Sequence, residues 1–189
     1  GQKQIGGFDL SKHKVVLIGS QNIKDERKGM NYLIELFEIL DRKLTHAQRK
    51  ELLFLIVGKK INLNLSFNYL NLGKLSIEAL VNAYGVADVF LCSSIEDNGP
   101  MMINEALMCG TPVVCFKVGI GNDLVSKKTG YLSKKFDSED LAHGLMQVLF
   151  DSDLQKMSQY CRDFALSHYS NEKIKNAWKQ LIKQYDTFQ

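Results

Sequence analysis

Two acidic residues with seven residues between them, Asp97 and Glu105, are the side chains of this sequence best suited to chemistry. They lie in the stretch CSSIEDNGPMMINEALMCGTPVV, which has the pattern of a strand end, a loop, a buried helix and a second strand. Asn98 or Gly99 is predicted to cap that helix, with Pro100 in its first turn. The unpaired N–H groups of a helix start and the positive end of the helix dipole bind anions. The stretch therefore predicts an anion site beside two carboxylates.

Glu105 is expected to lie in apolar surroundings. Its neighbours leave the predicted helix almost no solvated face: Met101, Met102, Ile103, Ala106, Leu107, Met108 and Cys109. Because a lone buried carboxylate is costly, Glu105 needs either protein donors, such as a backbone N–H or a Lys, or a polar ligand in a cleft. Perturbed acids beside helix starts gather at functional sites, so we favour the ligand.

Short apolar runs, several of them β-branched and followed by Gly, predict strands that are buried on both faces. These runs cover residues 15–19, 52–58, 66–73, 87–94, 111–116 and 130–132. Segments of helix length separate them, which requires a parallel sheet with crossover helices. The sequence therefore predicts an α/β fold, with a doubly wound, Rossmann-like parallel sheet of about six strands and helices on both faces.

The helical segments have amphipathic spacing and start signals. The pattern over residues 30–44 predicts one helix, and Ser76 is expected to cap another. A capping box is predicted from Ser152 to Gln155. The last helix is predicted from the spacing of Ile174, Trp178, Leu181 and Ile182.

The composition suits one soluble domain over residues 1–189, with 45% apolar and 24% charged residues. A chain of this length can bury a core that needs neither disulfides nor metal. The net charge is only +3, and the basic residues form no aromatic-interleaved stripe, which argues against nucleic-acid binding.

The cysteines indicate a reducing compartment. They lie mainly in apolar runs and lack CxxC pairs or histidine partners: Cys92, Cys109, Cys115 and Cys161. Reduced thiols are therefore expected rather than a zinc site. No signal segment opens the chain and no apolar run is long enough to span a bilayer, so we expect a cytoplasmic location. Because the chain starts with Gly rather than Met, we expect it to be part of something longer.

Motifs of competing chemistries are absent or incomplete. Gly119 and Gly121 resemble a dinucleotide fingerprint, but the third small residue is missing and the preceding strand is the wrong one. The chain has no Walker loop and no GxSxG elbow. Its four histidines are scattered over predicted helices and termini: His13, His46, His143 and His168.

In doubly wound sheets, ligands bind beyond the carboxyl ends of the strands, where the topology reverses. Arg27 and Lys28 follow the first predicted strand, and residues 96–99 follow the strand at 87–94. A cation that faces a helix start would suit a diphosphate. The alternative is that Arg27 and Lys28 belong to a solvated helix start, since most charges are surface charges.

Several segments resemble the retaining GT-B glycosyltransferases of family 4, specifically their C-terminal, donor-nucleotide-binding half. RKGMNYLIELF is similar to the family's Lys-Gly helix start, FLIVG and LGKLS to the next two strand ends, and ADVFLCSS to the segment before the acidic motif. DNGPMMINEALMCGTPVV resembles the E-x7-E motif, with Asp97 in the first acidic position and Glu105 in the second. The resemblance covers nearly the whole chain.

The resemblance implies a role for each matched position. Lys28 would neutralise the diphosphate with the amides of Gly99 to Met102. Glu105 would accept hydrogen bonds from the ribose hydroxyls, Asp97 would lie by the donor sugar, and the loop at Leu72 and Gly73 would line the base. The predicted catalytic residues are Lys28, Asp97 and Glu105, and the predicted nucleotide-binding residues are Arg27, Gly73, Asn98, Gly99, Pro100, Met101 and Met102.

The implied reaction transfers a sugar from a UDP- or GDP-type nucleotide sugar to an acceptor hydroxyl with retention. Neither a metal nor another cofactor is implied. The acceptor, a glycan or a lipid-linked molecule, would bind an N-terminal domain that these residues lack, so this chain alone should be largely inactive. Bacterial surface-polysaccharide synthesis is the expected pathway, and a lipid-linked acceptor would be compatible with peripheral membrane association of the full-length protein.

The sequence departs from the family pattern in three places. The family often has an Arg soon after the first strand's glycine, whereas residues 19–22 here read GSQN, so Arg27 is the candidate replacement. Asp97 replaces the more usual Glu, and Glu96 is an alternative first acid. The family's paired glycines are interrupted in the segment GIG at residues 119–121.

Two other functions remain open from the sequence. A nucleotide-sugar epimerase can share the GT-B architecture, and a non-catalytic, flavodoxin-like binding module can share the sheet. The extended acidic motif fits neither as well.

Overall fold

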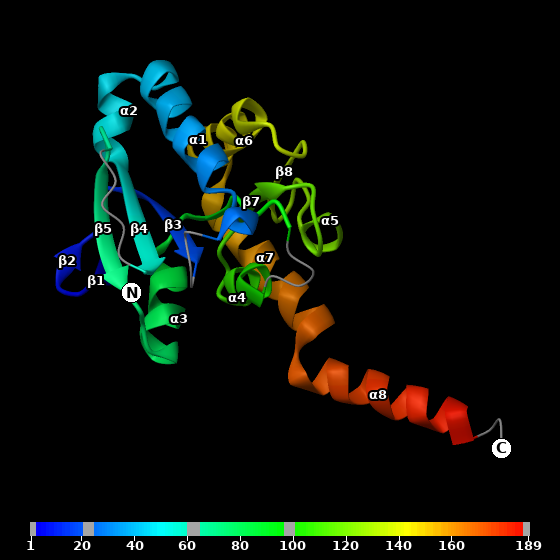
Figure 1. Ribbon diagram of the computed structural model, residues 1–189. Helices are drawn as coiled ribbons and strands as arrows, with labels where there is room; N and C mark the ends of the chain where they lie inside the picture. Colours follow the sequence, from blue (N-terminus) through cyan, green and yellow to red (C-terminus); the bar gives the residue numbers. More distant parts are fainter. Residues whose placement is uncertain (1–2, 21–24, 60–64, 97–100, 187–189) are drawn as a thin grey trace.

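The computed structural model describes residues 3–20, 25–59, 65–96 and 101–186 (Figure 1). Its centre is a six-stranded sheet in the order β5-β4-β3-β6-β7-β8, and all neighbouring strands are parallel. The strands are β3 (Lys14–Ser20), β4 (Leu52–Gly58), β5 (Asn68–Gly73), β6 (Val89–Cys92), β7 (Val113–Phe116) and β8 (Gly130–Ser133). Each predicted strand is present, with ends within two residues of the prediction.

The strand order confirms the doubly wound fold. The chain begins the sheet at its middle with β3, adds β4 and β5 on one side, and then returns to β6 on the other side of β3. The topology therefore reverses between β3 and β6. Crossover connections of a doubly wound sheet leave a crevice beyond the carboxyl ends of the strands at such a point.

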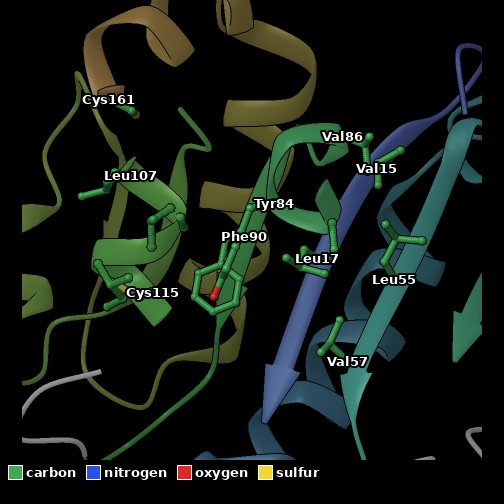
Figure 2. Packing of buried hydrophobic residues seen from close by; sticks show 14 of the residues in the cluster. Val15, Leu17, Leu55, Val57, Tyr84, Val86, Phe90, Leu107, Cys115 and Cys161 are labelled. Atoms are coloured by element: carbon green, nitrogen blue, oxygen red, sulfur yellow. The ribbon is translucent and has the colours of Figure 1, made fainter. Parts of the chain in front are cut away.

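The continuous apolar runs are explained by helices on both faces. Val15 and Leu17 of β3 pack in one buried cluster, whereas Val16 and Ile18 pack in the other, as the alternation of a strand requires. Figure 2 shows part of the first cluster, in which Tyr84 and Phe90 lie beside β3. One such cluster covers each face, so the sheet forms the middle layer of a three-layer domain.

The first face carries α3, α4 and α7, and the second carries α1 and α6 (Figure 1). The helices are η1 (Glu26–Lys28), α1 (Met30–Lys43), α2 (His46–Glu51), α3 (Ile77–Val86), α4 (Met101–Met108), α5 (Gly121–Leu124), α6 (Ser138–Met146), the π-helical η2 (Gln147–Asp151), α7 (Leu154–Tyr169) and α8 (Asn171–Asp186). Ser76 caps α3 as predicted, because its hydroxyl accepts the N–H of Ala79 at 3.3 Å.

Three details differ from the sequence-based expectations. A short antiparallel hairpin, β1 (Gln4–Ile5) with β2 (Phe8–Asp9), precedes the sheet and was not predicted. The capping box at Ser152 is wrong: the hydroxyl of Ser152 donates back to the carbonyl of Gln147 at 3.1 Å, so Asp153 caps α7 through the N–H of Lys156. The predicted last helix is present as α8, but it extends away from the body (Figure 1) and its described side chains are exposed.

Candidate active site at the switch point of the sheet

The site is built where the chain leaves β3 and β6. From β3 it continues into the turn η1, and from β6 it continues into residues 93–96 towards α4. Four of the predicted site residues, Asp97, Asn98, Gly99 and Pro100, lie outside the described residues. The roles predicted for those four residues stay predictions. The structure describes the residues on either side of them.

The turn η1 and the segment after β6 are hydrogen-bonded to each other. Ser93 Oγ donates to the carbonyl of Lys28 at 2.8 Å, and the N–H of Ile95 donates to the carbonyl of Arg27 at 2.8 Å. Gly29 permits this approach, because its φ is 64° and a Cβ there would overlap the carbonyl oxygen of Ser93. The structure thus brings Lys28 beside the residues that lead into the acidic segment.

Arg27 and Lys28 differ in how their side chains are held. Arg27 is exposed and makes a two-point contact with Asp25, with Nε to Oδ1 at 3.0 Å and Nη2 to Oδ2 at 2.7 Å. This contact holds the pKa of Asp25 below its ordinary value. Arg27 would therefore have to exchange Asp25 for a phosphate in order to bind one. Lys28 is half-buried.

The start of α4 packs against the end of β3. A Cβ at Gly19 would overlap the Cε atom of Met102, so the absence of a side chain at Gly19 allows Met102 to lie over the strand end. Met102 is half-buried and Met101 is 70% exposed. The described part of α4 therefore begins beside the carboxyl end of β3.

Glu105 is held by a tyrosine. The hydroxyl of Tyr84 in α3 donates to Glu105 Oε2 at 3.0 Å. Within the described ranges, Tyr84 is the only residue hydrogen-bonded to the Glu105 side chain, so the partner is neither the backbone N–H nor the Lys that the sequence suggested. Burial, and then the neighbouring carboxylate of Glu105, raises the pKa of Tyr84 far above its ordinary value.

α4 has little solvated surface, as expected. One side of the helix, formed by Ile103, Ala106 and Leu107, is buried, and among its other residues only Met101 is exposed. Glu105 itself is half-buried, at the border of that side. A carboxylate in this position can combine one interior partner with access from outside the core.

Gly73 ends β5, two strands from β3 in the sheet. Its φ of 68° turns the chain out of the strand towards α3, in a conformation that glycine adopts readily. Because the sheet is parallel, Gly73 lies at the same edge of the sheet as the turn that carries Lys28.

Tyr84 was missed as a site residue by sequence reasoning. It lies on α3 and is buried, at 1% exposure. Its spacing in the sequence gives no sign of its hydrogen bond, because Glu105 is 21 residues further along the chain.

A prominent cavity lies elsewhere. A cavity of about 660 Å³ is lined by Lys3, Asp88, Gly110 and Pro112 among others, which lie at the amino ends of β6 and β7. That edge is opposite to the one where the end of β3 and the start of α4 lie. We therefore locate the site by the strand topology and not by the cavity.

The described residues also lack metal-binding clusters and membrane-spanning helices. No group of three or more His, Cys, Asp or Glu side chains in these ranges is arranged to hold a metal ion. Each described helix is also too short or too polar to cross a bilayer.

Comparison with known proteins gives a family match over most of the chain. A family model described as "Glycosyl transferases group 1" matches residues 3–165. N-acetyl-alpha-D-glucosaminyl L-malate synthase of Bacillus anthracis is 27% identical over 185 residues, which are 95% of this chain and 46% of that protein. D-inositol 3-phosphate glycosyltransferase of Corynebacterium urealyticum is 32% identical over 109 residues, which are 57% of this chain and 25% of that protein. The chain thus spans less than half the length of these relatives.

Solved structures share the fold. Sucrose-phosphate synthase from Thermosynechococcus elongatus superposes with a TM-score of 0.74 and 21% identity, covering 93% of this chain and 46% of that one. HepE of Anabaena, solved with UDP and glucose, gives a TM-score of 0.70 and 19% identity, covering 93% of this chain and 49% of that one. At these identities the likeness concerns the fold alone.

Proposed function

Since this chain belongs to the glycosyl transferases group 1 family, we propose that it is the nucleotide-sugar-binding half of a retaining, family 4 glycosyltransferase of GT-B architecture. The observation that carries the proposal is the pair of hydrogen bonds that join the η1 turn to the residues after β6 at the switch point. They place a half-buried lysine beside the chain segment that leads into the acidic motif, where a diphosphate would bind.

In the proposed mechanism, Lys28 and the amides at the start of α4 bind the diphosphate. Cleavage of the glycosidic bond increases the negative charge on the phosphate oxygens. A fixed cation and preorganised N–H donors then stabilise the transition state more than the ground state. Because this stabilisation comes from the chain itself, the proposal requires no divalent metal.

Glu105 is proposed to accept hydrogen bonds from the ribose, and Asp97, or Glu96 in its place, from the donor sugar. The segment ending at Gly73 would line the base. Several solved neighbours contain UDP, among them HepE of Anabaena with UDP and glucose and the pneumococcal O-GlcNAc transferase GtfA with UDP and GlcNAc. UDP is therefore the first nucleotide to test.

Acceptor binding is assigned to a second domain. The chain covers 46% of the Bacillus anthracis relative, and the GT-B site is a cleft between two such domains. We propose a glycan or lipid-linked acceptor of a bacterial surface-polysaccharide pathway. On this view the present chain binds nucleotide and transfers little or no sugar.

The test is binding of UDP and GDP to the chain, measured by calorimetry and by the shift in melting temperature. Lys28→Ala and Glu105→Ala should each abolish the shift. Lys127→Ala and Glu38→Ala are matched controls, because both residues are exposed and Lys127 lies near the amino end of β8. Unchanged shifts in both site variants would refute the assignment.

The other candidate functions predict different results. An epimerase would interconvert free UDP-sugars without an acceptor, which a sugar-isomer assay of the full-length protein detects. A flavodoxin-like binding module would ignore both nucleotides in calorimetry.

A further inference from the structure

We propose that Tyr84 is a positioning residue, whose buried hydroxyl orients the Glu105 carboxylate so that it can receive the ribose hydroxyls of the nucleotide. The inference rests on the proposed function, because it assigns a partner to the carboxylate that would hold the ribose. It adds a residue from a different helix, α3, to the site formed by η1 and α4.

First, the Glu105 carboxylate lies between the protein core and the surface. Tyr84 Oη lies 3.0 Å from Glu105 Oε2, and Tyr84 is only 1% exposed, whereas Glu105 is half-buried. An ionised carboxylate can accept about four hydrogen bonds on its two oxygens. Tyr84 supplies one donor from the interior, and no other described residue donates to this side chain. The remaining acceptor positions suit the hydroxyls of a ligand.

The second step is that Tyr84 is itself fixed. Thr111 Oγ1 donates to the carbonyl of Tyr84 at 2.8 Å, and the N–H of Thr111 donates to the carbonyl of Ala106 in α4 at 2.8 Å. Thr111 thus joins the end of α3 to α4. The Tyr84 ring packs edge-on against Phe90, with centroids 5.7 Å apart and an interplanar angle of 77° (Figure 2). These contacts hold the hydroxyl in place relative to α4.

The third step concerns charge. Because burial and the adjacent carboxylate raise the pKa of Tyr84, its phenol stays protonated and remains a donor at any physiological pH. A lysine in this position would form an ion pair and neutralise Glu105. A tyrosine orients the carboxylate and leaves its full negative charge, which strengthens hydrogen bonds from neutral hydroxyls.

The experiment compares UDP with 2′,3′-dideoxy-UDP by calorimetry for the wild-type chain, Tyr84→Phe and Glu105→Gln. The wild type should bind UDP more tightly than the dideoxy nucleotide. Tyr84→Phe removes one hydrogen bond to a charged group and should weaken UDP binding about tenfold. Its affinity for the dideoxy nucleotide should change little, because that ligand has no ribose hydroxyls that could donate hydrogen bonds to Glu105.

The matched control is Tyr131→Phe. Tyr131 Oη donates to Asp140 Oδ1 at 3.0 Å, so the substitution removes the same kind of bond at β8, remote from the switch point. UDP affinity should not change in this variant. Melting temperatures of all variants report whether each one is folded, and Glu105→Gln keeps a side chain of the same shape beside Tyr84.

The outcomes distinguish a positioning role of Tyr84 from a purely structural one. If Tyr84→Phe weakens both nucleotides equally, its role is structural and the inference is overturned. It is also overturned if Glu105→Gln weakens UDP binding and Tyr84→Phe does not, although the proposed function then stands. If the wild type binds neither UDP nor GDP, the proposed function fails and the inference fails with it.

Discussion

The hydroxyl of Ser93 donates a hydrogen bond to the carbonyl oxygen of Lys28 at 2.8 Å, across the switch point of the sheet. The two residues are 65 positions apart in the sequence. Ser93 is 8% exposed, so water cannot readily replace the bond. The backbone of the predicted phosphate-binding lysine is therefore fixed by the strand that leads to the acidic motif.

Ser93→Ala should loosen this connection. We expect a loss of about 1 kcal/mol in the free energy of unfolding, because a part-buried carbonyl loses its donor. UDP affinity should fall as well, since Lys28 becomes less well positioned. Urea unfolding and calorimetry measure the two effects. Ser167→Ala is the control, because Ser167 Oγ also donates to a carbonyl, that of Phe164 at 2.8 Å, but on the exposed surface of α7. A larger loss of stability in the control would contradict this account.

Two glycine substitutions should have opposite effects on stability. Gly29→Ala places a Cβ against the carbonyl of Ser93 at a φ of 64°, and we expect it to cost about 2 kcal/mol or more. Gly85→Ala lies in α3 with open space around its Cβ and should stabilise the chain by about 0.5–1 kcal/mol. Thermal or urea unfolding of both variants tests the prediction. A stable Gly29→Ala variant would show that the turn can move away from β6.

Asp140 should contribute to the loss of stability in acid. Although burial alone would raise its pKa, hydrogen bonds from the N–H of Lys134, from Tyr131 and from Ser133 outweigh burial and lower it. Because the folded pKa lies below 3.8, the stabilisation is present above the unfolded value and is lost as the pH falls through the folded one. Asp140→Asn should be less stable than the wild type at pH 7, and the difference should shrink below about pH 4. A difference that is constant with pH would contradict the prediction.

The buried thiols should be unreactive in the folded chain. Burial raises the pKa of Cys161 to about 12, and it raises the pKa of Cys115 well above its ordinary value. At pH 8 both groups are therefore almost entirely protonated, and the thiolate is the reactive form. A thiol reagent should modify them only after unfolding in urea, and should reach the half-buried Cys109 earlier. Rapid labelling of Cys161 under native conditions would show that α7 opens from the body.

The fold could be predicted in large part because buried strands and helices have recognisable patterns of apolar residues in the sequence. Both faces of β3 are covered, so Val15 to Ile18 are all apolar, and that pattern requires no knowledge of which helices provide the cover. The hairpin of β1 and β2 has no such pattern, since two strands of two residues are too short to show a periodicity. The cap of α7 was displaced from Ser152 to Asp153 because the π-helical turn before it takes the serine hydroxyl.

For the site, the sequence by itself determined the residue types: an acidic pair in a helix-start motif, a lysine after the first strand, and a family pattern that connects them. Only the tertiary structure decided that Ser93 holds Lys28 and that Tyr84 holds Glu105. The physical reason is that periodicity reports which side of an element is buried, whereas a hydrogen bond between residues far apart in the chain depends on where the packed elements bring them.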